Sequence, residues 1–187
     1  MLFAMTYQEQ CYWAKNMIMI DSPPIENSLG FLALVSYVIT LMPSIARVVF
    51  PKSKKSLLPK LLLKKRRLIG VLAFLFAFLH GWLLIHKRHI DFADLKTSWV
   101  YSQGIATMVI FTLLAATSND WSVKALKKNW KQLHRLTYIA MFLLTWHVWD
   151  KMSGHWTYIT PISMAAILTI TTLYIIRLWR ERKTLNQ

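Results

Sequence analysis

Long apolar segments alternate with short, strongly basic segments along most of this chain. The apolar segments lie at about residues 28–46, 68–86, 98–116, 133–149 and 158–176. Each approaches the roughly 20 residues that a helix needs to cross about 30 Å of hydrocarbon. Helices are expected, because a segment inside a bilayer must satisfy its own backbone hydrogen bonds. The pattern predicts an all-α fold, an integral membrane helical bundle of about five transmembrane helices.

The composition agrees with a membrane protein and argues against several soluble classes. Of the 187 residues, 55% are hydrophobic and 17% are charged, with a mean hydropathy of +0.35. The net charge of +15 would suggest nucleic acid on a soluble basic face, but the basic residues cluster between apolar segments. The expected partner is therefore membrane lipid, with no nucleic acid. The single cysteine, Cys11, excludes an internal disulfide and a protein-ligated iron–sulfur cluster.

The first 27 residues differ from the five apolar segments. They contain scattered polar residues, and they lack the basic start and the small-residue cleavage site of a signal peptide. Residues 1–27 are expected to form an extracytoplasmic or interfacial segment with a short amphipathic helix. Residues 28–180 would then form the transmembrane domain, and residues 181–187 a cytoplasmic tail.

The distribution of Lys and Arg predicts the orientation of the chain. Eighteen of the 23 basic residues lie in segments 47–67 and 117–135 or after residue 176. Segments on the cytoplasmic side of membrane proteins are enriched in these residues. The N-terminus is therefore expected outside and the C-terminus inside. The second and fourth spans then both run from inside to outside.

Two histidines are expected at matched depth in these parallel spans. His80 lies 13 residues after Arg67, and His147 lies 12 residues after Arg135. At about 1.5 Å per residue, both stand roughly 18–20 Å above the inner boundary. A single histidine in a span is explained equally well by a hydrogen bond to a neighbouring helix. Two at one depth favour ligation of one haem iron from both faces, whereas zinc or copper would need further ligands at that depth.

Two stretches of the sequence carry a resemblance to a known family. The stretch "KKRRLIGVLAFLFAFLHGWLL" holds two arginines, a glycine and His80. The stretch "ATSNDWSVKALKKNWKQLHRLTYIAMFLLTWHVW" holds His134 and, thirteen residues later, His147. Over about residues 28–180 the chain resembles the ferric reductase-like transmembrane domain family. Within that family it is most similar to the haem-binding membrane subunits of bacterial periplasmic methionine sulfoxide reductase systems.

The resemblance implies haem b as the cofactor and functional roles for His80, His134 and His147. One haem between His80 and His147 is the main expectation. No flavin or NAD(P)H domain follows residue 187, so a self-contained NADPH oxidase or ferric reductase is not expected.

His134 is expected at the start of the helix that carries His147, about 20 Å lower and about 140° around that helix. A second haem there would lack an opposite ligand, because the residue 14 positions before His80 is Arg66. A second haem stays one alternative, and an interfacial histidine is another. In a third, His134 acts with Arg66 and Arg67 on haem propionates or a quinone headgroup. A quinone or FMN is a possible additional cofactor.

These features predict a membrane b-type haem protein that carries electrons from a cytoplasmic-side or quinone donor to an extracytoplasmic acceptor. The alternative function is an accessory or assembly subunit of a larger membrane complex, in which haem is structural. The expected partners are redox proteins on one or both sides, a periplasmic reductase among them. The expected location is a bacterial inner membrane, or a thylakoid membrane. His86, His89 and His155 are expected near the outer surface, without a role at the iron.

Overall fold

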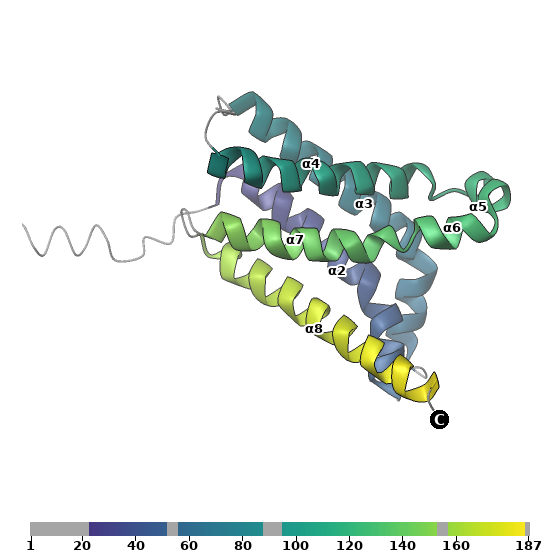
Figure 1. The fold of residues 1–187 in the computed structure, drawn as a ribbon. Coiled ribbons are helices and arrows are strands. Elements are labelled where there is room, and N and C mark those ends of the chain that lie inside the picture. Colours follow the sequence, from purple (N-terminus) through teal and green to yellow (C-terminus); the bar gives the residue numbers. More distant parts are fainter. Residues whose placement is uncertain (1–22, 52–55, 88–94, 153–156, 186–187) are drawn as a thin grey trace, which may run out of the picture.

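The computed structural model describes residues 23–51, 56–87, 95–152 and 157–185 (Figure 1). Predictions for residues 1–22 therefore lie outside the described residues, and so do those for His89 and His155. Within the described residues the chain is helical, and it contains no β-strand that extends beyond a single bridge residue.

Five long helices make up the bundle. They are α2 (Ile25–Val49), α3 (Leu57–Lys87), α4 (Leu95–Ala116), α7 (Leu136–Met152) and α8 (Ile159–Leu185). In α2, α3, α4 and α8 the length and the apolar composition are sufficient to cross a membrane. Helix α7 has 17 residues and so covers about 25 Å. The predicted helical membrane bundle is confirmed, and the chain is an integral, multi-pass membrane protein.

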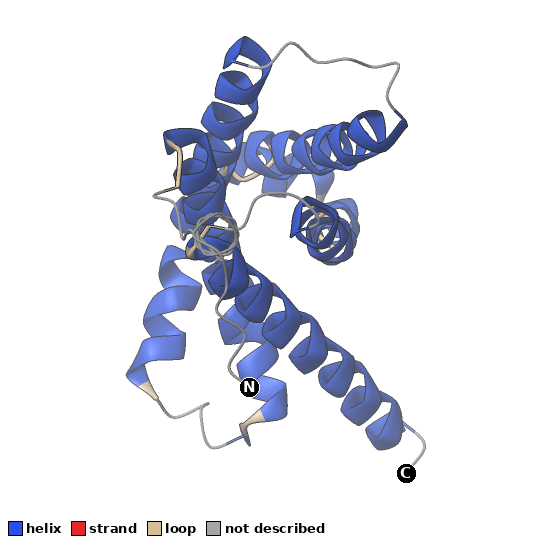
Figure 2. Cartoon of the chain, turned by 90° about the vertical axis from the view of Figure 1, so that its left-hand side faces the viewer, coloured by secondary structure: helices blue, strands red, loops and turns tan. Residues whose placement is uncertain are grey.

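The long helices alternate in direction and form a closed ring of neighbours. Helix α2 packs against α3 and α8, α7 packs against α8 and α4, and α4 packs against α3. Figure 1 shows the starts of α2, α4 and α8 at its left-hand end, beside the ends of α3 and α7. We call this the distal end, and Figure 2 looks along the bundle from it. The opposite end carries the short helices α5 (Asp120–Leu126) and α6 (Lys128–Leu133), and we call it the basic end.

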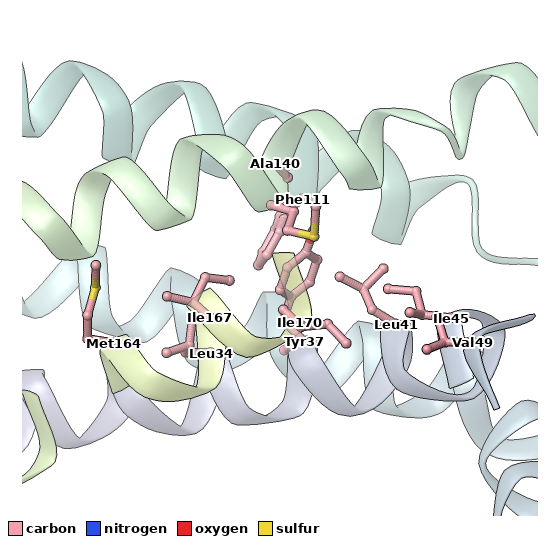
Figure 3. Close-up of a cluster of buried hydrophobic side chains, with 12 residues drawn as sticks. Leu34, Tyr37, Leu41, Ile45, Val49, Phe111, Ala140, Met164, Ile167 and Ile170 are labelled. Carbon is pink, nitrogen blue, oxygen red and sulfur yellow. The ribbon is translucent and has the colours of Figure 1, made fainter. Parts of the chain in front are cut away.

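A core of buried side chains joins the five long helices between these two ends. Leu41 of α2, Met141 of α7 and Ile167 of α8 are completely buried in it. Tyr37 and Phe111 meet at its centre with ring centroids 5.1 Å apart (Figure 3). The Tyr37 hydroxyl donates a short hydrogen bond to the backbone carbonyl of Thr137, so the only polar group of that ring is satisfied inside the bundle.

The segments expected to be loops at the basic end are partly helical. Helix α3 begins at Leu57, so the basic run "KKRR" lies within the helix and not before it. At 31 residues the helix is about 46 Å long, which exceeds the hydrocarbon thickness by several turns. Segment 117–132 contains α5 and all but the last residue of α6. The side chain of Asn119 caps α5 by accepting from the backbone N–H of Ser122 at 2.7 Å. Lys127, with φ at 47°, separates the two short helices.

Candidate functional site

His80 lies near the distal end of α3, and its half-buried imidazole rests on the first turns of α2. Nδ1 lies 2.6 Å from the backbone carbonyl oxygen of Glu26. The ring also covers Gly30, where an added Cβ would stand only 3.0 Å from Cε1 of His80. A hydrogen bond and a close ring contact therefore hold this imidazole against α2.

His147 repeats the arrangement on α7 and α4. Its Nδ1 lies 3.2 Å from the backbone carbonyl oxygen of Val100. A Cβ added to Gly104 would stand 3.5 Å from Cε1 of His147. At both sites the accepting carbonyl precedes the glycine by four residues. Each imidazole therefore spans about one turn of the helix beside it.

These two hydrogen bonds assign the proton on each ring. A backbone carbonyl only accepts, so Nδ1 of His80 and Nδ1 of His147 are the donors. In a neutral imidazole the lone pair then belongs to Nε2. Histidines that ligate metals commonly donate their other ring N–H to a backbone carbonyl or a carboxylate. Both rings therefore have the tautomer that a metal ligand needs at Nε2.

The donor set around these histidines is small. Among the described residues, no group of three or more His, Cys, Asp or Glu side chains could hold a metal ion. A haem iron needs only axial ligands, because the porphyrin supplies the remaining four, so the two imidazoles fit it.

A polar pair lies beside each imidazole. The Glu26 carboxylate accepts from Nζ of Lys87 at 2.9 Å. Gln103, which precedes Gly104, donates from Nε2 to Oδ2 of Asp150 at 2.7 Å. The side-chain oxygen Oε1 of Gln103 is buried and has no hydrogen-bond partner among the described residues. Charged and amide groups thus lie close to both rings at the distal end.

His134 lies in the turn between α6 and α7, because α7 begins only at Leu136. The expectation that His134 shares a helix with His147 was wrong. The backbone N–H of Arg135 donates to the Gln132 carbonyl, three residues back, which makes a turn at this point. The angular offset of about 140° expected for an ideal helix therefore does not apply.

The His134 ring carries its proton on the other nitrogen. Nε2 lies 3.3 Å from the hydroxyl oxygen of Thr117, whose own proton is donated to the Leu113 carbonyl at 2.7 Å. The hydroxyl oxygen therefore accepts from Nε2–H. The ring stacks on Trp130 with centroids 4.0 Å apart. Burial, reinforced by the positive charge of Arg66, lowers the pKa of His134 below its ordinary value.

The two arginines near His134 differ in their surroundings. Arg67 donates from Nη1 to Oδ1 of Asp120 at 2.7 Å, and both side chains are largely exposed. Arg66 is half-buried on the same helix and acts electrostatically on His134. Its position at the basic end places a fixed positive charge close to that neutral imidazole.

A cavity of about 50 Å³ lies next to this region of the bundle. Its walls come from α2, α3, α4 and the start of α7, and they consist of Tyr37, Thr40, Gly70, Ala73, Phe111, Leu114, Ala115, Ser118 and Thr137. Pockets for cofactor-sized ligands measure roughly 300–1,000 Å³. The cavity is therefore large enough for water and too small for a porphyrin, a flavin or a quinone ring.

The family named ferric reductase like transmembrane component matches residues 29–145. The chain belongs to this family. His80, His134, Arg66 and Arg67 lie within the matched residues, and His147 lies two residues beyond them.

Three curated relatives share the name protein-methionine-sulfoxide reductase heme-binding subunit MsrQ. The relative from Brucella anthropi is 31% identical over 121 residues, which cover 62% of this chain and 51% of the relative. The relative from Bordetella pertussis is 28% identical over 128 residues, or 65% and 62% of the two chains. The relative from Brucella ovis is 28% identical over 160 residues, or 80% and 66%. The chain thus spans about half to two thirds of the length of these relatives. No solved structure matches it.

Sequence reasoning missed the groups that hold the two distal histidines. Gly30 and Gly104 contact the rings, and the carbonyls of Glu26 and Val100 accept from them. A usable signal was present, since a glycine inside an apolar helix costs about 1 kcal/mol relative to alanine and often marks a close approach. Gly81, next to His80 in the sequence, instead has open space where its Cβ would be.

The other described histidine, His86, agrees with the prediction of a surface residue. It is exposed in the last turn of α3, and its ring packs on Trp82 with centroids 4.4 Å apart. Aromatic side chains are also exposed towards the distal end of the other helices, among them Trp99, Trp149 and Tyr158. Such a belt is typical of a membrane interface.

Proposed function

We propose that this chain is a membrane b-type haem protein that carries electrons, with His80 and His147 as the axial ligands of one haem. The observation that supports this most directly is the repeated hydrogen bond of Nδ1 to a backbone carbonyl. It gives both rings the same ligating tautomer at the same end of the bundle. The names of the MsrQ relatives, which describe heme-binding subunits, support the same cofactor.

A b-type haem bound there would supply reversible one-electron chemistry at its iron. The residues of this chain would hold the iron, fix both imidazole planes and exclude water with apolar helices. The two axial ligands and the burial around them would set the reduction potential. The chain needs no acid, base or nucleophile for this function, because electron transfer makes and breaks no bond in a substrate.

A single haem fits these residues better than two. His134 holds its proton on Nε2, the nitrogen that His80 and His147 would offer to iron. It also stacks on Trp130 and lies beside Arg66. In the proposed function His134 therefore stabilises the turn at the basic end, through Thr117 and Trp130, and does not ligate iron. Recognition of a quinone headgroup by His134 with Arg66 and Arg67 is a further part of the proposal.

The proposed direction of electron flow is from the basic end to the distal end. The basic end would face the cytoplasm, since it carries most of the Lys and Arg residues. A cytoplasmic-side or quinone donor would deliver electrons to the basic end. The positive charge of the basic end would attract an acidic donor protein. The acceptor would be an extracytoplasmic reductase. The names of the relatives suggest a protein-methionine-sulfoxide reductase in that role, at a bacterial inner membrane.

Visible spectra of the purified protein, oxidised and then reduced with dithionite, test this proposal. We expect a Soret band that shifts on reduction and sharp α and β bands, which are typical of six-coordinate low-spin haem. His80→Ala and His147→Ala should each abolish the low-spin spectrum. His86→Ala is the matched control, because it removes an exposed histidine six residues from His80, and it should keep the full spectrum. A colourless protein from haem-replete cells would contradict the proposal.

The alternative, an accessory subunit with a structural haem, predicts a different response in membranes. If the haem carries electrons, loss of the low-spin haem in His80→Ala should abolish electron flow to the extracytoplasmic acceptor. A structural haem would allow the flow to continue as long as the subunit is assembled. Rates of acceptor reduction in membranes with matched subunit levels separate the two functions.

A further inference from the structure

The contact between Gly30 and His80 is unusually close. A Cβ on Gly30 would stand 3.0 Å from Cε1, 3.1 Å from Nδ1 and 3.3 Å from Nε2 of His80. Carbon atoms in favourable contact lie about 3.5–4.0 Å apart. The imidazole therefore occupies the volume that any other residue at position 30 would need for its side chain.

The equivalent contact on the other imidazole is looser. A Cβ on Gly104 would stand 3.5 Å from Cε1 and 3.9 Å from Nδ1 of His147, which is ordinary van der Waals contact. The hydrogen bonds follow the same order, at 2.6 Å for His80 to Glu26 and 3.2 Å for His147 to Val100. Both distances thus show that the His80 ring is held more closely against α2 than the His147 ring is against α4.

We propose that Gly30 and the Glu26 carbonyl are positioning residues for His80, and that they hold it as the stronger of two unequal axial ligands. This inference rests on the proposed function, since it concerns the haem that His80 and His147 would ligate. Gly30 admits the ring to the surface of α2, and the carbonyl of Glu26, four residues earlier, fixes its tautomer and plane.

The contact with Gly30 and the hydrogen bond to the Glu26 carbonyl should both affect the iron. A short N–H···O bond at Nδ1 increases the basicity of Nε2 on the opposite side of the ring. A more basic ligand stabilises ferric iron relative to ferrous iron and so lowers the reduction potential. Displacement of the ring from Glu26 should therefore raise the potential. A fixed ring plane should also define the electron paramagnetic resonance (EPR) spectrum of the ferric state.

A glycine at this position has a simpler explanation, close packing of α2 on α3. Small residues serve that purpose at many helix interfaces in membranes. Gly70 provides the comparison, because it lies on the same interface, ten residues before His80 on α3. An added Cβ there would meet only Cγ2 of Thr40, at 3.9 Å. A packing role would affect stability at both glycines, and only a positioning role at Gly30 would change the iron.

Three glycine variants separate these roles. Gly30→Ala should retain haem, shift the largest EPR g value and raise the midpoint potential. Gly104→Ala should give a smaller shift in both quantities, and Gly70→Ala should match the wild type. Alanine favours a helix more than glycine does, so none of the three changes should unfold the chain. Unchanged EPR and potential in Gly30→Ala, or an equal shift in Gly70→Ala, would overturn the inference.

A second experiment examines the Glu26 carbonyl without a change at Gly30. In His80→Gly and His147→Gly, externally added imidazole should restore the low-spin spectrum. 1-Methylimidazole lacks the N–H that the carbonyl accepts. In His80→Gly, imidazole should act at a concentration about five- to tenfold lower than 1-methylimidazole. The preference should be smaller in His147→Gly, where the hydrogen bond is longer.

Equal preferences in the two variants would overturn the inference, because the intrinsic difference between the two added ligands cancels in the comparison. A wild-type protein without haem would instead contradict the proposed function itself. Failure of the inference and failure of the proposed function therefore give different results.

Discussion

His80 and Glu26 connect α3 to α2 at the distal end through the backbone of one residue and the side chain of the other. The Glu26 carbonyl oxygen lies 2.6 Å from Nδ1 of His80. The carboxylate of the same residue accepts from Lys87, seven residues after His80 on α3. The first turn of α2 is therefore attached to the last two turns of α3 at two points.

Removal of the lysine in this ion pair should cost more stability than removal of the acid. Glu26 has a side-chain exposure of 10% and Lys87 one of 51%, so the carboxylate is the more desolvated partner. Lys87→Met removes a cation from a buried carboxylate and should destabilise the fold by about 1–2 kcal/mol. Glu26→Gln removes the buried charge itself and should cost less. Thermal unfolding in detergent measures both effects.

The exposed Lys128 at the basic end provides the control for the loss of a positive charge. Lys128→Met should leave the unfolding temperature unchanged within error. A loss in Glu26→Gln as large as that in Lys87→Met would mean that desolvation of the carboxylate does not determine the effect.

In the core, too, the loss of stability on mutation should be larger at a buried position than at an exposed one. Leu41 is completely buried between α2 and its neighbours, whereas Leu75 of α3 is 45% exposed. Leu41→Ala removes packed atoms and should destabilise the bundle by about 3–4 kcal/mol. Leu75→Ala makes the same chemical change on a surface that faces outward, and it should cost less than about 1 kcal/mol. Unfolding temperatures of the two variants in one detergent provide the test.

The long apolar segments predicted the spans well, because hydropathy and length determine which parts of a chain can cross a bilayer. The helix ends at the basic end were predicted less well. Helix α3 begins at Leu57 because Lys and Arg are good helix formers in water, so the helix continues past the hydrocarbon. His134 was assigned to the wrong element because α7 begins three residues later than expected.

The sequence predicted which histidines form the candidate site, a role that stays a prediction, but it did not predict the groups that hold them. Spacing from the basic segments predicted His80 and His147 at one level, and both residues lie in the last turns of their helices, α3 and α7. The sequence could not show that Gly30 contacts His80 or that Gly104 contacts His147. The two residues of each pair lie on different helices and are 50 and 43 residues apart in the chain. Which residue faces which across two helices depends on tertiary packing, and hydropathy does not record it.

The orientation of the bundle leads to a topology prediction. A reporter fused after Gln187 should report the cytoplasm, and one inserted within residues 88–94 should report the outside. The physical reason is the concentration of Lys and Arg at the basic end. An alkaline phosphatase and green fluorescent protein pair at each site makes the measurement. A C-terminus outside would reverse the proposed direction of electron flow.

Replacement of His134 should leave the proposed haem in place. Its Nε2 donates to Thr117, so His134→Gln removes a side chain that makes a hydrogen bond at the basic end and ligates nothing in the proposed site. The low-spin spectrum and the haem-to-protein ratio should match those of the wild type. A haem-to-protein ratio reduced by about half would instead identify His134 as a ligand of a second haem.

His134 should also resist protonation. Burial lowers its pKa below the ordinary value of 6.5, with the positive charge of Arg66 acting in the same direction. The unfolded chain then binds this proton at a higher pH than the folded chain does. The stability that His134 contributes is therefore complete above pH 6.5 and is lost as the pH falls through the lower, folded-state pKa.

Carbon-13 NMR of labelled histidines, assigned with His134→Gln, should show a midpoint for protonation of His134 below pH 6.5. The unfolding temperature of the wild type should fall more between pH 7.5 and 5.5 than that of His134→Gln. A midpoint at or above 6.5 would contradict this prediction, because it would mean that the guanidinium and the buried surroundings leave the ring as easy to protonate as in water.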